Sequence, residues 1–199
     1  VGKFQHQQFA VEEKPANLAE LLESRPSASA TPVPTAATAN KLKFKSKLLP
    51  AEHVLEGRYE AVGFIGRGGV GAVYRVFALE THEEKAIKIL YPDLSRNESF
   101  TRYFIETGKF LSGLSHPNLV KVHSSGYSAT IQENHMVMDY MVGGCLGELM
   151  QRREVLPPKK AVDIAVELLG AVGYLHQNKL IHGGIHPGNV LFDGDGRPY

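Results

Sequence analysis

Residues 58–90 read RYEAVGFIGRGGVGAVYRVFALETHEEKAIKIL, and this stretch decides the fold. Two segments rich in β-branched and aromatic residues, 59–65 and 72–76, flank Gly66-Arg67-Gly68-Gly69-Val70-Gly71, which predicts two strands joined by a flexible turn. Because glycine has no Cβ and tolerates positive φ, the amides of such a turn can point at phosphate oxygens. Dinucleotide-binding folds use the same glycine spacing, but there the last glycine opens a helix, whereas here a strand follows.

The next apolar run, residues 85–90, contains a lysine. Lys88 follows Gly71 by seventeen positions. A lysine inside a strand must pair with an anion, extend its ammonium group to solvent or lose its proton, because burial disfavours the charged form. With the glycines upstream, we expect Lys88 to contact a bound anion; an ordinary exposed strand lysine is the alternative.

Further segments follow in a fixed order. The sequence predicts a helix over 100–114, followed by His116-Pro117-Asn118, and a methionine-rich strand over 136–141, followed by Val142-Gly143-Gly144. Leu156-Pro157-Pro158 introduces an amphipathic helix. One face of that helix carries Ile164, Leu168, Val172 and Leu175. The loop His182-Gly183-Gly184-Ile185-His186-Pro187-Gly188-Asn189 comes next.

Together these motifs resemble the protein kinase superfamily over residues 57–199, and in particular the eukaryotic-type Ser/Thr kinases of bacteria. The resemblance implies an α+β, bilobal protein-kinase-like fold with a complete β-rich small lobe and the first part of the helical large lobe. It divides the chain into an N-terminal tail with an Ala/Ser/Thr/Pro-rich linker (1–50), the small lobe with its hinge (51–142) and a partial large lobe (143–199).

Kinase spacing places the D-F-G aspartate about three residues beyond Tyr199. We therefore expect a chain truncated before D-F-G, and Val1 in place of a methionine indicates a processed or excised chain. In the family, the helix that carries Ile164 and Leu175 packs on later helices of the large lobe. We expect this apolar face to need a partner, an oligomer or more chain to cover it.

The resemblance also implies a nucleotide site for ATP with Mg²⁺. Ala86 and Met138, the gatekeeper, would lie beside the adenine, the main chain from Asp139 to Met141 would read the purine edge, and Lys88 would contact the α- and β-phosphates. Asn189 would help to hold the metal ion. The full set of implied nucleotide-binding residues is Ile65, Gly66, Gly68, Gly71, Val73, Ala86, Lys88, Met138, Asp139, Met141 and Asn189.

The loop departs from the family pattern at the position that carries the chemistry. Kinases read H-R-D there, and the aspartate accepts the proton of the substrate hydroxyl. Gly184 occupies the position of this aspartate, and Gly183 and His186 replace the loop arginine and lysine. A glycine has no side chain to orient a hydroxyl or to take a proton. We therefore expect no catalytic residue here and predict a nucleotide-binding pseudokinase that acts as a scaffold or allosteric regulator in signalling.

Two other functions stay open at this point. Phosphoryl transfer depends mainly on positioning and charge stabilisation, so an active Ser/Thr kinase with a non-standard loop is the first alternative. A protein-interaction module that binds no nucleotide is the second. A metal site formed by His182 and His186 is a weaker idea, because no carboxylate or cysteine lies near them in the sequence, and Asp193 and Asp195 are typical of a tight turn.

The helix over 100–114 should supply the carboxylate that pairs with Lys88 in the family. Counting by the family's usual intervals leads to Thr107, both forward from Lys88 and back from His116. Glu106 lies one residue before this position. Because a helix turns about 100° per residue, a neighbouring position faces a different direction. Either Thr107 occupies the partner position, or a local shift recruits Glu106.

Composition and the N-terminal region add weaker constraints. A net charge of +1 gives no general argument for nucleic acid as a partner, no apolar run approaches the length of a transmembrane helix, and the single Cys145 fits a reducing, cytoplasmic setting. The expected partners are a nucleotide and another protein. Ahead of the linker the sequence leaves two alternatives, a frayed tail, which is favoured, and a short helix capped by Asn17. Alternating lysines at 41–47 follow the linker.

Overall fold

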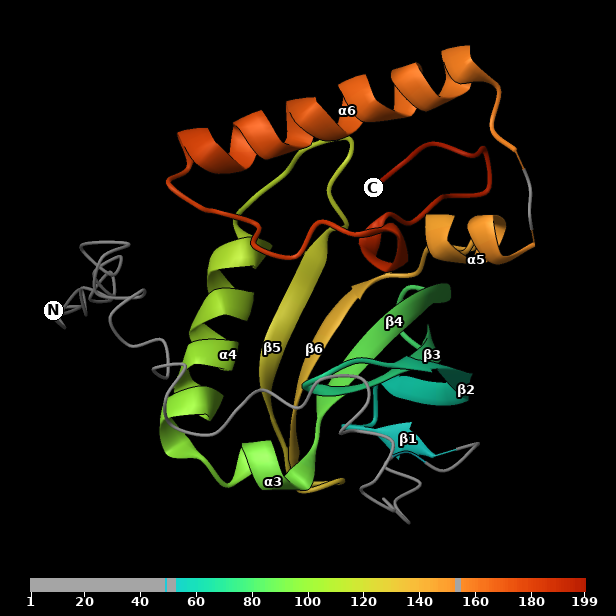
Figure 1. Cartoon of the computed structure of the whole chain (residues 1–199). Coiled ribbons are helices and arrows are strands. Elements are labelled where there is room, and N and C mark those ends of the chain that lie inside the picture. Colours follow the sequence, from blue (N-terminus) through green and yellow to red (C-terminus); the bar gives the residue numbers. More distant parts are fainter. Residues whose placement is uncertain (1–48, 50–52, 153–154) are drawn as a thin grey trace, which may run out of the picture.

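The computed structural model describes residue 49 and residues 53–152 and 155–199 (Figure 1). The segment with Asn17, the linker and the lysines at 41–47 lie outside the described residues. None of the helices in the described part of the chain combines the length and the apolar character that crossing a membrane would require.

A six-stranded antiparallel sheet forms the first half of the described chain. Its hydrogen-bonded order is β1-β2-β3-β4-β6-β5. The strands span Val54–Leu55 (β1), Tyr59–Arg67 (β2), Gly71–Ala78 (β3), Glu83–Leu90 (β4), Val122–Ser128 (β5) and Glu133–Asp139 (β6). The strands predicted from the glycine-rich hairpin, the lysine run and the methionine-rich run are thus confirmed as β2, β3, β4 and β6.

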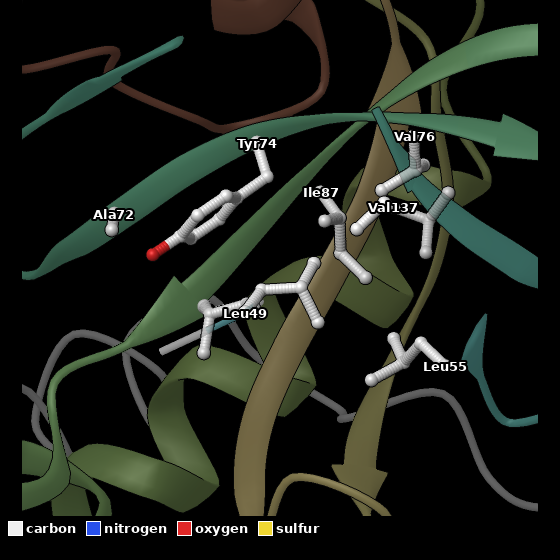
Figure 2. Packing of buried hydrophobic residues seen from close by; sticks show 9 residues of the cluster. Leu49, Leu55, Ala72, Tyr74, Val76, Ile87 and Val137 are labelled. Atoms are coloured by element: carbon white, nitrogen blue, oxygen red, sulfur yellow. The ribbon is translucent and has the colours of Figure 1, made fainter. Parts of the chain in front are cut away.

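One face of the sheet is sealed by a hydrophobic core. In β4 successive side chains point to opposite faces, so Ile87 and Ile89 lie on one face and Ala86 and Lys88 on the other. Both isoleucines are fully buried in a cluster with residues of β3 and β6, which Figure 2 shows. The cluster consists of Leu49, Leu55, Ala61, Ala72, Tyr74, Val76, Ile87, Ile89 and Val137.

Helix α4 (Glu98–Ser112) lies beside β5 (Figure 1). It packs on the sheet through a second hydrophobic cluster, whose buried residues are Leu90, Phe104, Val122 and Met136. The Asn97 side chain caps its first turn by accepting a hydrogen bond from the Phe100 amide, as expected for an asparagine at this position. Phe104 packs there with Leu90 and Met136 of the sheet. A short helix, α3 (Pro92–Ser95), links β4 to α4.

The second half of the described chain is helical and lies beyond one end of the strands (Figure 1). It comprises α5 (Leu146–Gln151), α6 (Pro158–Gln177) and a single 3₁₀ turn, η1 (Pro187–Asn189). Asn118, from the H-P-N tripeptide, connects it to the preceding part: its Nδ2 donates to Glu167 Oε2 of α6 at 2.8 Å and to the Pro198 carbonyl at 2.9 Å. The predicted α+β architecture is confirmed.

The expectation about the apolar face of α6 was wrong. Ile164 and Leu175 are buried within the described chain, and Ile164 packs on Val190 and Phe192, which follow the loop. The exposed apolar residues of α6 lie on another face: Val162, Val166 and Leu169 are 61, 62 and 67% exposed. The sequence pattern identified the buried face of the helix but not the segment after the loop that covers it.

Candidate functional site

Lys88 lies in the middle of the sheet. It is paired in register with Val73 of β3 and with Met136 of β6, and two residues earlier Ala86 is paired with Met138. Because residues directly opposite each other in antiparallel strands share a face, Val73, Ala86, Lys88 and Met138 lie on one face, opposite the sealed core. The structure thus brings together four residues of the predicted nucleotide site.

The ammonium group of Lys88 has no carboxylate partner in the described part of the chain. Burial in the sheet lowers the pKa of Lys88, and no counter-charge offsets this effect. The nearby Lys85 differs, since its Nζ lies 3.0 Å from both Glu83 Oε2 and Asp139 Oδ1. A partly buried ammonium group without a partner among the described residues favours the binding of an anion, because an anion would replace part of the solvation that the group has lost.

Helix α4 presents Thr107, not Glu106, on its buried side. Thr107 lies one helical turn from Phe104 and Leu111, which both pack on the sheet, and its Oγ1 is buried without a hydrogen-bond partner. No ion pair joins Glu106 to Lys88 among the described residues. Of the two alternatives, the arrangement therefore supports Thr107 at the position where kinases place a carboxylate.

Close packing holds α4 in this orientation. A Cβ added at Gly108 would clash with the Ser125 side chain of β5 and crowd Met136 Cε, so the absence of a side chain lets helix and sheet approach. Ser125 Oγ also donates a hydrogen bond of 2.9 Å to the Ile105 carbonyl. A rotation of α4 that carried Glu106 toward the sheet would have to break both contacts.

The glycine-rich hairpin joins β2 and β3. The pairing of these strands shifts register near Gly63 and again near Gly66, and the Gly68 amide donates to the Gly71 carbonyl at 2.9 Å. A Cβ at Gly71 would collide with the Ile89 carbonyl of β4, so the hairpin can lie against β4 only with glycine there. Ile65 remains 46% exposed.

Asp139 is the last residue of β6, and its carboxylate contacts side chains of two other strands. Asp139 Oδ1 lies 2.6 Å from His123 Nε2 of β5 and 3.0 Å from Lys85 Nζ of β4. Partial burial acts to raise the pKa of Asp139, but the hydrogen bonds from His123 and Lys85 outweigh it and lower the pKa. The carboxylate is thus used within the sheet, and only main-chain groups of Asp139 to Met141 remain for the purine edge that the sequence predicts.

The loop around Gly184 is held by its own polar groups. Asn189 Nδ2 donates to the Gly184 carbonyl at 2.8 Å, while His182 Nδ1 accepts from the Gly184 amide and His186 Nδ1 from the Gly188 amide. Gly183 has φ +67°, which glycine adopts without strain. Both imidazoles use Nδ1 locally, and the described residues contain no cluster of three or more His, Cys, Asp or Glu able to hold a metal.

Gly184 itself has free space around it. A Cβ placed there would meet Asn189 Nδ2 at 3.5 Å and His182 at 3.9 Å, which are ordinary van der Waals distances. The backbone of the loop therefore accepts a Cβ at this position. Asp193 does not replace the aspartate of the family pattern, because its Oδ1 accepts the amides of Asp195 and Arg197 at 2.9 Å each, as predicted for a turn residue.

The residues fit a nucleotide phosphate better than they fit a complete metal site. Lys88 offers a cation that has no ion-pair partner among the described residues, and the hairpin offers backbone amides. Asn189 Nδ2 is engaged by the loop, which leaves Oδ1 as a single amide oxygen for a cation. Mg²⁺ is usually held by one or two carboxylates as well as by substrate phosphates.

Comparisons with known proteins show which family the chain resembles. The chain is 34% identical over 139 residues to the serine/threonine-protein kinase PrkC of Bacillus subtilis, with 70% of this chain and 21% of the relative covered. It is 30% identical to PknB of Mycobacterium leprae, with 69% and 22% covered. The chain therefore spans about a fifth of the length of the curated relatives it matches.

Solved structures agree as well. The kinase domain of Mycobacterium tuberculosis PknI superposes with a TM-score of 0.65 at 29% identity, covering 75% of this chain and 60% of that domain. The small-lobe sheet and helices described above are therefore a kinase-like fold. Because the protein kinase domain matches residues 59–198, which is most of the chain, this chain belongs to the protein kinase family.

Proposed function

We propose that this chain is a nucleotide-binding pseudokinase that acts as a scaffold or allosteric regulator in signalling. The single observation that supports it is the contrast between Lys88, a partly buried cation without a described partner, and Gly184, which has no side chain at the proton-accepting position. We propose the division predicted above, with a small lobe over 51–142 and a partial large lobe over 143–199.

The nucleotide would be ATP, which the protein kinase family generally uses together with Mg²⁺. Lys88 would bind the phosphates, and Ala86 and Met138, paired across β4 and β6, would form the apolar surface for the adenine. Asn189 would offer one oxygen to Mg²⁺. Mg²⁺ would supply charge neutralisation between the phosphates.

The loop offers no evident replacement for the missing aspartate. A neutral imidazole that accepts a hydrogen bond at Nδ1 carries its proton on Nε2, so His182 and His186 present donors rather than a base to the outside. Losing a general base costs about 10²- to 10⁴-fold in rate. A protein that binds a nucleotide without turning it over can still change its conformational equilibrium when the nucleotide binds. An allosteric regulator requires such a change.

The direct test is a thermal-shift titration of the full chain with ATP and Mg²⁺. We expect a concentration-dependent rise in Tm that is lost in Lys88→Ala. Lys109→Ala, which removes an exposed lysine from the far side of α4, is the matched control and should respond like the wild type. If neither the wild type nor the control responds, nucleotide binding is wrong and an interaction module without nucleotide takes its place.

An active Ser/Thr kinase is the second candidate, and the names of the relatives favour it. PrkC and PknB are both serine/threonine-protein kinases. The test is transfer of labelled phosphate from ATP to a generic Ser/Thr substrate by a chain extended beyond Tyr199. Transfer that disappears in Lys88→Met would replace the pseudokinase proposal, whereas transfer that persists would indicate a contaminating kinase.

A further inference from the structure

The two edge strands of the sheet are joined by a contact that lies outside the predicted nucleotide site. β1 and β5 are the first and last strands in the hydrogen-bonded order. Glu56, directly after β1, accepts a hydrogen bond of 2.6 Å from Ser128 Oγ at the end of β5 and one of 3.4 Å from Thr130 Oγ1 in the following turn. Ser128 is fully buried. The contact therefore closes the curled sheet edge to edge.

The same short stretch also fills the core. Leu49 and Leu55 are 3% and 0% exposed, and they pack in the cluster that includes Ile87 (Figure 2). The main chain is tied to β2, since Leu55 pairs with Tyr59 and the Ala61 amide donates to the His53 carbonyl at 2.9 Å. We call Leu49 and residues 53–56 the strap.

The position of the strap connects two parts of the chain. It precedes residue 59, where the match to the protein kinase domain begins, and so lies between the N-terminal region and the family domain. Its leucines pack with Ile87 and Ile89, the neighbours of Lys88 in β4. Lys88 lies between these two isoleucines on the same strand but faces the other side of the sheet. A backbone shift that moves the isoleucines therefore moves Lys88 as well.

We propose that the strap is a conformational device that couples the chain ahead of the kinase domain to Lys88. While Glu56 is bound to Ser128 and the two leucines are packed, β4 is held in place. Release of the strap loosens β4 and lowers nucleotide affinity without any change to groups that touch the nucleotide. Thr130 is exposed beside Glu56, so negative charge added at Thr130 would repel the carboxylate and release the strap.

The experiment measures amide hydrogen exchange of β4 and ADP affinity in the full chain. Glu56→Gln weakens the charged hydrogen bond, and Thr130→Asp places a like charge beside it. We expect each variant to accelerate exchange in β4 by about threefold to tenfold, which corresponds to the loss of one hydrogen bond. We also expect each variant to bind ADP more weakly than the wild type. Glu80→Gln, which removes an exposed carboxylate paired with Arg58, is the matched control and should change neither quantity.

A double variant sharpens the test. Glu56→Gln combined with Ser128→Ala should have no larger effect on exchange than Ser128→Ala alone, because the hydrogen bond that Glu56→Gln weakens is already absent in Ser128→Ala. Additive effects, or exchange in β4 at the wild-type rate in both Glu56→Gln and Thr130→Asp, would overturn the proposal. The affinity measurement rests on the proposed nucleotide binding. If the wild type binds no ADP, that function fails, while the exchange rates still decide whether the strap controls β4.

Discussion

The strand that carries Lys88 and the loop that carries Gly184 are built in opposite ways. In β4 the charged group is present, and a fully buried core with Ile87 and Ile89 supports it from behind. In the loop the backbone frame is present, with Asn189 bound to the Gly184 carbonyl, but Gly184 has no side chain at the position that the family resemblance assigns to the proton-accepting aspartate. A local frame can therefore persist without its functional group, and retention of a motif's shape does not establish its activity.

The largest difference between β4 and the loop around Gly184 should lie in how much core packing contributes to the free energy of unfolding. Ile87→Ala removes a fully buried side chain from β4 and should lower the free energy of unfolding by about 2–5 kcal/mol. Ile185→Ala, in the loop at a residue that is 62% exposed, should change it by less than about 0.5 kcal/mol. Urea denaturation of both variants measures the difference. Equal losses would show that the loop is packed as tightly as the sheet.

The packing of α4 on β5 comes next in size. Gly108→Ala should destabilise the fold by about 1–2 kcal/mol, because the added methyl group meets Ser125 and this overpacking outweighs the gain in helix propensity. Gly173→Ala is the control, since nothing lies within 4 Å of a Cβ built there in the middle of α6. It should stabilise the helix by up to about 1 kcal/mol. A stabilising Gly108→Ala would mean that α4 is free to move.

The charge on Lys88 predicts a smaller effect that depends on pH. Burial lowers the pKa of Lys88 in the folded chain below its unfolded value, so above the lowered pKa the unfolded state binds more protons and this contribution to stability rises toward pH 10.5. Lys88→Met should therefore be more stable than the wild type at neutral pH, with an advantage that shrinks as the pH increases. Tm values from pH 7 to about 10 check this. A gap that widens instead would mean that Lys88 has an anionic partner in the folded protein.

The smallest effect is expected at Gly184. Gly184→Asp should alter the free energy of unfolding by less than about 0.5 kcal/mol, because a Cβ there has free space. Phosphate transfer should remain far below that of an intact kinase, since Gly183, His186 and Thr107 still depart from the family pattern. Radiometric assays of wild type and variant side by side decide this. Full rescue would show that the loop lacks nothing except this one carboxylate.

The elements that sequence patterns predicted are those with strong local signals. Glycines between β-branched runs predicted β2 and β3, and the apolar face with Ile164 and Leu175 predicted α6. Strand β5, VHSSGYS, was missed because it is polar and lacks the usual alternation. It is a strand because it pairs with β6 and packs under α4, which are contacts between residues distant in the sequence. The strand β1 was missed because its two residues are too few to show an alternating pattern.

The candidate site shows the same division. Counting between motifs located Lys88 and proposed Thr107, but which side of α4 faces the sheet depends on the contact of Gly108 with Ser125, which no local pattern reveals. The prediction for Asp139 concerned only its main-chain groups, and the contacts of its carboxylate with His123 and Lys85 were not predicted. The closing contact between Glu56 and Ser128 spans 72 positions and leaves no trace in either segment alone.

The sequence by itself determined that Gly184 has no side chain to accept a proton and that Lys88 lies in a strand behind a glycine-rich hairpin. These properties follow from residue identity and short-range order, which folding does not alter. Only the tertiary structure decided that Lys88 is without a carboxylate among the described residues, that Thr107 lies on the buried side of α4 and that the edges of the sheet meet at Glu56. Solvation, orientation and pairing depend on which distant segments pack together, and burial free energy is summed over the whole fold.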